Sequence, residues 1–436
     1  MGKVYRPYYP GEELLLPPSL RDWLPEKHLA YFVSDVVDNL DLSAMDAVYG
    51  NEKRGQPPYD PWMMTKVLVY AYCVGVFSSR RIERRLVEDI AFRVLAAGNQ
   101  PNFRTISDFR KIHLKTLEGL FEQVLQIALE AGAIKVGRVA LDGTKMKANA
   151  SKHKAMSYDR MGEKGKQLRA EVKQLLKQAE AADAEEDARY GRDRTGDELP
   201  AELERRETRL KKIREAKRAL EERARQKAMG EGTDPKQAQP KEKDQYNFTD
   251  PESRIMKGAD GFVQGYNAQA AVEPDLQLIV GQTVTQATND KEQLMPMVEV
   301  IERQSGQRPE EILADSGYCS EKNLEALESA SQPERRMEGY IATERQKHDE
   351  YREACPKGPL PKDATRVDRM RRKLKTKTGK AVYAARKAIV EPVFGQIKHA
   401  RGFRQFLLRG IDKVRGEWSL LCLTHNILKC YRLCYE

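Results

Sequence analysis

The stretch VGRVALDGT, residues 136–144, decides how the chain folds. Its apolar and β-branched residues form one short run, and an acid, Asp142, stands near the end of that run. A short apolar run of this kind is typical of a buried β-strand. A carboxylate placed there is costly unless it has a partner. We therefore predict a buried strand with Asp142 at or near its end.

Two later stretches combine apolar residues with a single acid in the same way. EEILADSGY, residues 310–318, predicts a second strand that ends at Asp315, and VEPVFGQIK, residues 390–398, predicts an apolar helical face that carries Glu391. Adjacent strands of one sheet could place the two aspartates side by side, and a helix packed across the sheet could bring Glu391 to them. With 66 Asp and Glu residues in the chain, most acids are solvated, so the apolar context singles these three out.

A cluster of three carboxylates would repel itself without cations. Mg²⁺ prefers hard oxygen ligands, so such a cluster predicts a site for one or two Mg²⁺ ions. Two ions about 4 Å apart activate an attacking hydroxyl group and stabilise the leaving oxygen in phosphodiester cleavage. The net charge of +10 and the pI near 9.1 also favour a polyanionic partner, most simply nucleic acid.

Length and composition exclude other classes of protein. The 436 residues suggest two or three domains, and the 40% of hydrophobic residues are enough for a core. The longest apolar run, 67–77, is shorter than the roughly 20 residues that span a bilayer. The first residues, MGKVYRPYYPGEE, lack the apolar region of a secretory signal. We expect a soluble, intracellular protein whose six irregularly spaced cysteines are free thiols.

Residues 1–132 are predicted to be compact and helical. Asp60 and Pro61 are a helix-starting pair, Gly75 breaks the pattern, and a basic helix follows. The arginines that cover one arc of this second helix are Arg80, Arg81, Arg84 and Arg85. A helix, a short turn and a basic helix outline a helix-turn-helix, although an ordinary amphipathic helix with a solvated face fits the pattern equally well. One long amphipathic helix, capped at Thr105 or Asp108, is then expected to end at Gly132.

Residues 152–246 differ in composition from the rest of the chain. Lys, Arg, Glu, Ala and Gln dominate residues 164–229, and two helical runs are joined by RYGRDRTGDELP, residues 189–200. This pattern predicts an antiparallel helical hairpin or a partly mobile charged insertion, with too few apolar residues for a core of its own. Beyond it, the pattern predicts a β-hairpin over 261–285, a strand over 339–343, a strongly basic stretch over 366–380, and helices over 382–398 and 412–433.

Several of these stretches together resemble the DDE transposases of bacterial insertion sequences. The motifs that carry the resemblance are YDPWMMTKVLVYAYCVGVFSSRRIE (59–83), VALDGTKMKANAS (139–151), TDPESRIM (249–256), GFVQGYNAQ (261–269), ILADSGYCSEKN (312–323) and VEPVFGQIKHARGFRQFLLRG (390–410). They are spread over nearly the whole chain, and together they are highly specific.

The resemblance implies an α/β fold with three parts. These are an RNase H-like catalytic domain of residues 133–151 and 247–436, a helical N-terminal DNA-binding domain of residues 1–132, and the helical hairpin insertion of residues 152–246. It implies that Asp142, Asp315 and Glu391 are the catalytic, metal-binding triad, with two Mg²⁺ ions per active site and Mn²⁺ as a substitute. The implied partners are double-stranded DNA, as terminal inverted repeats and target, and further copies of the chain in a homodimer or larger assembly. A cytoplasmic, nucleoid-associated enzyme without a membrane segment is expected.

The family's last motif places a Tyr and an Arg before the Glu and a Lys seven residues after it. Lys398 and Tyr383 match, but Arg386 stands five residues before Glu391 where four are expected, and Lys387 holds the expected position. All four basic or aromatic residues are candidates for DNA contact. On an ideal helical wheel Lys387 faces with Glu391 and Arg386 does not. Pro392 is expected to kink the helix or to begin a new one.

Other functions fit the sequence less well. A haloacid-dehalogenase-type phosphatase needs a second Asp where Thr144 stands. Cys422, His425, Cys430 and Cys434 drift around one predicted helix, so one zinc ion could not collect them, and buried packing is the better interpretation. A DNA-binding repressor without chemistry and a nuclease that only hydrolyses DNA remain alternatives to the transposase. The presence of all three carboxylates favours the enzyme.

Overall fold

A computed structural model describes residues 19–49, 57–190, 201–230, 232–258, 261–328, 337–344, 355–356, 358–361 and 363–435. The stretch MGKVYRPYYPGEE and most of the linker between the two insertion helices, residues 191–200, lie outside the described residues. Within the described ranges, no helix combines the length and the apolar character needed to cross a bilayer.

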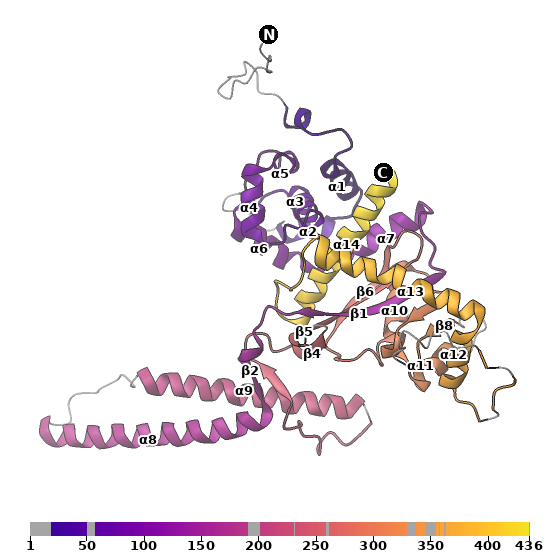
Figure 1. Cartoon of the computed structure of the whole chain (residues 1–436). Helices are drawn as coiled ribbons and strands as arrows, with labels where there is room; N and C mark the ends of the chain where they lie inside the picture. Colours follow the sequence, from indigo (N-terminus) through magenta and orange to yellow (C-terminus); the bar gives the residue numbers. More distant parts are fainter. Residues whose placement is uncertain are drawn as a thin grey trace, which may run out of the picture.

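A mixed sheet is the centre of the molecule (Figure 1). Its strands are β1 (Arg138–Lys147), β4 (Arg254–Gly258), β5 (Gly261–Val272), β6 (Ile279–Thr285), β7 (Glu311–Ala314) and β8 (Glu338–Ile341). The order is β4-β5-β1-β7-β8, and β6 pairs with β5 beside β4. β1 runs antiparallel to β5 and parallel to β7, which in turn runs parallel to β8. The predicted β5–β6 hairpin is confirmed, whereas β4 was not predicted.

Asp142 lies in the middle of β1, so the prediction that the strand ends there is wrong. β1 continues to Lys147, because all of its residues from Ala140 onward pair with β5. On the other side β1 pairs with β7 only from Arg138 to Ala140. The two pairings overlap at Ala140, inside the apolar run, and Asp142 lies just beyond the part of β1 that pairs with β7.

Helices cover the sheet and close the chain. They are α10 (Leu294–Ser305), α11 (Glu321–Glu328), α12 (Arg366–Lys375), α13 (Lys377–Gly395) and α14 (Ile411–Tyr435). α13 packs against β1, β5, β7 and β8, while α10 and α14 both pack against β6. The basic stretch 366–380 forms α12 and the first turn of α13, and a capping box of Thr365 and Asp368 begins α12.

α13 runs through Pro392 without a break, so no new helix begins there and the kink is the alternative that stays a prediction. A proline inside a helix cannot donate to the carbonyl four residues earlier, here that of Ala388. The side chain of Gln277, at the turn between β5 and β6, donates to this carbonyl with a Nε2–O distance of 2.9 Å. The freed acceptor is thus satisfied from outside the helix. The helix then widens into a π-helical turn, Gln396–Ala400.

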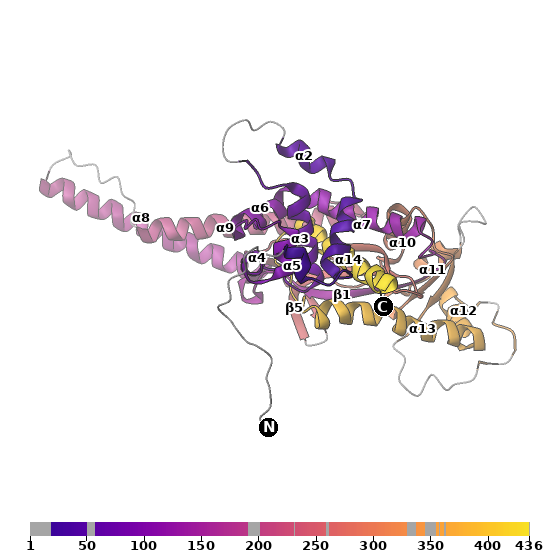
Figure 2. The same ribbon diagram turned by 90° about the horizontal axis from the view of Figure 1, so that it is seen from above.

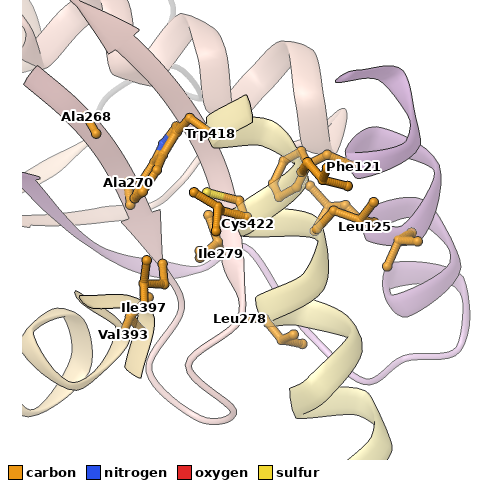
Figure 3. Close-up of a cluster of buried hydrophobic side chains, with 14 of the residues drawn as sticks. Phe121, Leu125, Ala268, Ala270, Leu278, Ile279, Val393, Ile397, Trp418 and Cys422 are labelled. Carbon is orange, nitrogen blue, oxygen red and sulfur yellow. The ribbon is translucent and has the colours of Figure 1, made fainter. Parts of the chain in front are cut away.

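The N-terminal helices share one hydrophobic core with the sheet. They are α1 (Leu29–Asp38), α2 (Ser43–Tyr49), α3 (Pro61–Cys73), α4 (Ser79–Glu88), α5 (Ile90–Leu95), α6 (Phe103–Ile112) and α7 (Leu114–Glu130), after a 3-10 turn η1 (Leu20–Trp23). α14 lies between these helices and the sheet: its Cys422 stands between Phe121 of α7 and Ile279 of β6, and its Trp418 lies against Ala270 of β5 (Figure 3).

Three local predictions for these helices can be compared with the structure. Asp60 accepts from the backbone N–H of Met63 at 2.9 Å, so it caps α3 as predicted. The single long helix from Thr105 is wrong, because the chain forms α6 and α7 with a break at His113, and Asn102 is the residue that caps α6. Gly132 has the left-handed φ of 67° expected of a residue that ends a helix.

The insertion forms a hairpin that projects from the rest of the molecule (Figures 1 and 2). After a 3-10 turn η2 (Lys152–Lys154), β2 (Ala155–Ser157) pairs with β3 (Gln245–Asn247), and between them α8 (Tyr158–Tyr190) packs against α9 (Ala201–Gly230). Contrary to expectation, the insertion has a small core of its own, separate from the main one. The core residues are Met161, Leu168, Leu210, Ile213, Ala216 and Leu220, with Tyr158, Tyr246 and Phe248 packed against them.

Candidate active site

Asp142 and Asp315 lie next to each other on neighbouring strands. β1 and β7 pair in parallel with Ala140 opposite Leu313, and continuing this register by two residues places Asp315 opposite Asp142. Asp315 directly follows β7 and begins a 3-10 turn, η3 (Ser316–Tyr318), where it accepts from the N–H of Gly317 at 2.9 Å. The predicted pairing of these two acids is thus present in the fold.

The environment of Asp142 disfavours its charge. The pKa of Asp142 is raised from 3.8 to about 6, chiefly by burial. The negative charges of Asp315 and Asp290 contribute to this rise, whereas Arg386 and the N–H of Gly143 act in the opposite direction. Two carboxylates that share a partly buried site cannot both ionise without cost. The site therefore has an unmet need for positive charge.

Arg386 of α13 supplies part of that charge. Its Nη1 lies 3.5 Å from Oδ2 of Asp142, and the Arg386 side chain is only 8% exposed. Tyr383, one turn earlier, also shares a hydrogen bond with Arg386. Within the described part of the chain, Nε of Arg386 is buried and has no hydrogen-bond partner. Arg386, and not the exposed Lys387, is therefore the basic residue that faces the site.

Lys398 approaches the same strand from the π-helical turn. Its ammonium group donates to Oγ1 of Thr144, two residues after Asp142 on the same face of β1. Burial lowers the pKa of Lys398, and the charge of Asp142 raises it. Lys398 is thus the second cation beside Asp142, in agreement with its place in the motif.

Glu391 belongs to α13 but is exposed, while its neighbours Ile389, Val390 and Val393 are buried. Among the described residues, which include all three predicted acids, no group of three or more His, Cys, Asp or Glu side chains is arranged to hold a metal ion. The structure thus brings together Asp142 and Asp315, and it places Glu391 on the same helix as Arg386 without closing the triad.

The donor set nevertheless suits a divalent cation. Asp142 and Asp315 offer adjacent hard oxygen atoms, which Mg²⁺ and Mn²⁺ prefer. The pKa of Asp142 stays raised although Arg386 and Lys398 lie beside it, so additional positive charge would stabilise the ionised pair. These two carboxylates would hold the metal, and Glu391 is the acid on α13 available to join them.

Asp290 is a residue of this site that the sequence did not reveal. It lies in the loop between β6 and α10, and its Oδ2 comes within 3.6 Å of the position that a Cβ on Gly317 would occupy. It raises the pKa of Asp142 by its charge. NDKEQ, residues 289–293, has no apolar run around the acid, so no local signal separates Asp290 from a solvated aspartate.

The arginines of α4 are exposed, and Ile82 and Leu86 on the opposite side of the helix are buried. Arg80 stacks over Phe103, with its guanidinium carbon 5.0 Å from the ring centroid, and Arg85 pairs with Asp89 at 3.3 Å. Arg81 and Arg84 complete the predicted basic arc. The helix, turn and basic helix are therefore present as α3, residues 74–78 and α4.

A groove of about 610 Å³ opens at the base of the insertion, between η2 and α9. Three exposed cations, Lys154, Arg209 and Lys212, line it with one acid, Glu215. Tyr246 and Phe248 of the β3 segment form an aromatic wall, with ring centroids 5.5 Å apart. This combination of cations and aromatic rings is typical of a nucleic-acid surface.

Comparison with known protein families gives two matches. The family model described as "Transposase domain (DUF772)" matches residues 18–112, which hold α1 to α6. The family model described as "Transposase DDE domain" matches residues 233–427, which hold β4 to β8, Asp315, Arg386 and Glu391. No curated protein and no solved structure matches the chain.

The raised pKa of Asp142 leads to a prediction about stability. The rise from 3.8 to about 6 corresponds to about 3 kcal/mol by which folding disfavours the charged carboxylate. This cost is absent below pH 4 and complete above pH 6. We expect Asp142→Asn to raise the midpoint of thermal unfolding of the metal-free protein at pH 8 and not at pH 4.

The measurement is thermal unfolding with a chelator present at both pH values. Asp412→Asn is the control, because the side chain of Asp412 is 91% exposed and should change the midpoint little at either pH. Equal effects of Asp142→Asn at pH 4 and pH 8 would contradict this account of the site.

Proposed function

We propose that this chain, which belongs to the DDE transposases of insertion sequences, binds the terminal inverted repeats of its element, cleaves DNA at the element ends and joins the freed 3′-OH to target DNA. The DDE domain implies an RNase H-like core, and the mixed sheet centred on β1 agrees with it. The observation that carries the proposal is the adjacency of Asp142 and Asp315 beside Arg386 and Lys398.

The proposed catalytic residues are Asp142, Asp315 and Glu391, which would hold two Mg²⁺ ions, with Mn²⁺ as a substitute. When bound, the metal supplies a polarised water or hydroxyl nucleophile and charge stabilisation at the phosphate. In the first step the water oxygen bonds to phosphorus, the P–O3′ bond breaks and the 3′ oxygen gains a proton. In the second step this 3′-OH oxygen loses its proton and bonds to a target phosphorus, a P–O3′ bond of the target breaks, and the released 3′ oxygen of the target gains a proton.

The basic side chains beside the acids have separate roles. Arg386, held by Tyr383, keeps Asp142 ionised and oriented while the site awaits its cation. Lys398 contacts Thr144, which lies two residues after Asp142 on the same face of β1. An ammonium group at this place can bind a phosphate of the DNA backbone. Tyr383 thus acts through Arg386, and Lys387 is left as a candidate contact on the exposed side of α13.

Two surfaces are proposed to hold the DNA outside the active site. The arginines of α4 are one, and the groove at the base of the insertion is the other. The cations Arg209 and Lys212 suit backbone phosphates, and the rings of Tyr246 and Phe248 suit stacking with a base. The basic helix α12 would add to this grip. Because transposition holds two ends together, at least two subunits with two-fold symmetry are expected.

The first prediction of this proposal concerns the acids. We expect Asp142→Asn, Asp315→Asn and Glu391→Gln each to abolish cleavage of DNA carrying the element ends, because each would remove a metal ligand, while end binding stays within about twofold. Cleavage is followed by mapping strand breaks on a plasmid with both ends in Mg²⁺. Glu302→Gln, which removes an ion pair with Arg308 at the far end of α10, is the control that should cleave normally.

The result separates the candidate functions. Loss of cleavage with retained binding supports the transposase. Binding without any cleavage by the unchanged protein would indicate a repressor without chemistry, and cleavage without joining would indicate a nuclease. Normal cleavage by Glu391→Gln would remove this residue from the triad.

The second prediction concerns α4. Arg81→Ala with Arg84→Ala is expected to weaken end binding and to make the log–log salt slope less steep by about 0.9 for each phosphate that is no longer neutralised. The measurement is a mobility-shift titration at several salt concentrations. Deleting the N-terminal helices is not a clean test, because they share the main core with α14. Arg303→Ala, an exposed arginine on α10, is the control; an unchanged slope in the double variant would refute the assignment.

The third prediction concerns the groove of the insertion. Arg209→Ala with Lys212→Ala should lower the affinity for element ends severalfold and slow pairing of two ends in light-scattering assays, because both cations line the groove. The control is Arg218→Ala with Arg225→Ala, which removes the same charge from exposed positions of the same helix. Equal losses in the two double variants would show that only net charge matters.

A further inference from the structure

Asp290 is a nearly buried acid with several hydrogen-bond donors around it, and its side chain is 16% exposed. Oδ1 accepts from Nδ2 of Asn267 at 2.6 Å and from Nε2 of Gln269 at 2.7 Å. Nζ of Lys145 lies 3.2 Å from both carboxylate oxygens. Asn267 and Gln269 are fully buried, so Asp290 is held by side chains that have little freedom to move.

These donors lie directly behind the catalytic strand. In the antiparallel pairing of β1 with β5, Gly143 faces Gln269 and Lys145 faces Asn267, so these four positions share one face of the sheet. Asp142 and Thr144 point to the opposite face, toward Arg386 and Lys398. The network around Asp290 therefore supports β1 from the face of the sheet opposite to the one that carries Asp142 and Thr144.

Gly143 makes this approach possible. A Cβ on Gly143 would lie 2.8 Å from Oδ1 of Asp290 and 2.9 Å from Oδ1 of Asn267, closer than side-chain carbons approach in folded proteins. Asp142 thus presents its carboxylate on one face of β1, and Gly143 leaves room for a neighbouring side chain on the other face. Asp290 fills that position against the backbone of β1.

The same network reaches the second aspartate. Tyr318 closes the turn that Asp315 begins, it is fully buried, and its hydroxyl group donates to Oε1 of Gln269. The other end of the Gln269 amide donates to Asp290. One chain of hydrogen bonds thus connects the turn of Asp315, through Gln269 and Asp290, to Lys145 on β1.

We propose that Asp290 is a positioning residue, which fixes the spacing between the carboxylates of Asp142 and Asp315 through the strand that carries one and the turn that carries the other. This inference rests on the proposed function. A carboxylate can accept from several donors at once, whereas an Asn in its place offers one oxygen and adds two N–H donors of its own. In Asp290→Asn one carboxylate oxygen becomes an amide donor. That donor would face Lys145, or Asn267 and Gln269 if the amide is turned the other way.

The test measures metal dependence and not activity alone. For Asp290→Asn, the Mg²⁺ concentration for half-maximal end cleavage should rise about 10-fold to 100-fold, the effect typical of residues that orient metal ligands. The affinity of the protein–DNA complex for Mn²⁺, measured by calorimetry, should fall by the same factor. A purely structural defect would lower the active fraction and leave the half-saturating concentration unchanged.

A second variant and a control make the outcome decisive. Tyr318→Phe removes only the hydroxyl group that joins the turn of Asp315 to Gln269, and it should shift the metal dependence in the same direction. It replaces Asp290→Asn as the test if Asp290→Asn does not fold. Glu302→Gln should leave the metal dependence unchanged. The inference would be overturned if Asp290→Asn folds and keeps the metal dependence of the wild type. If Asp290→Asn does not fold, the same result in Tyr318→Phe would overturn it. An unchanged protein that cleaves no element ends would instead overturn the proposed function.

Discussion

The ion pair between Arg386 and Asp142 is the contact on which the arrangement of the site depends. It joins α13 to β1, the central strand of the sheet. The side chain of Arg386 is 8% exposed and that of Asp142 is 20% exposed. A half-buried carboxylate beside a second one needs such a cation to remain charged. The pair thus links α13 to β1, and the positive charge of Arg386 opposes the rise in the pKa of Asp142 that burial causes.

The turn between β5 and β6 secures the same helix at a second point. Gln277, in a left-handed conformation with φ of 58°, satisfies the carbonyl that Pro392 leaves without a donor. Its own oxygen atoms accept from Lys429 and contact the ring of His425 on α14. Pro392 is thus tolerated within α13 because this turn supplies the missing donor, and the same turn connects α13 to α14.

Much of this could be predicted from the sequence, and the failures have physical causes. The pairing of Asp142 with Asp315 followed from apolar runs that end near acids, because burial along a strand leaves a local signal. The choice of Arg386 over Lys387 could not be predicted, because the helical wheel was oriented on Glu391. The helix is instead oriented by its buried side chains, Val390 among them, and these turn Arg386 toward the sheet and leave Glu391 exposed. Asp290 had no local signal at all, since its donors come from strands brought beside it only by folding.

The separate core of the insertion bears on how the enzyme would hold DNA. Six buried side chains, contributed by α8 and α9, stabilise the hairpin independently of the sheet, while β2 and β3 tie its base to the end of β1. The packing of the hairpin is thus separate from the main core, and residues 148–154 connect it to the end of β1. The basic groove lies at this junction. DNA bound there, as proposed, would contact the chain a few residues after β1, the strand that carries Asp142.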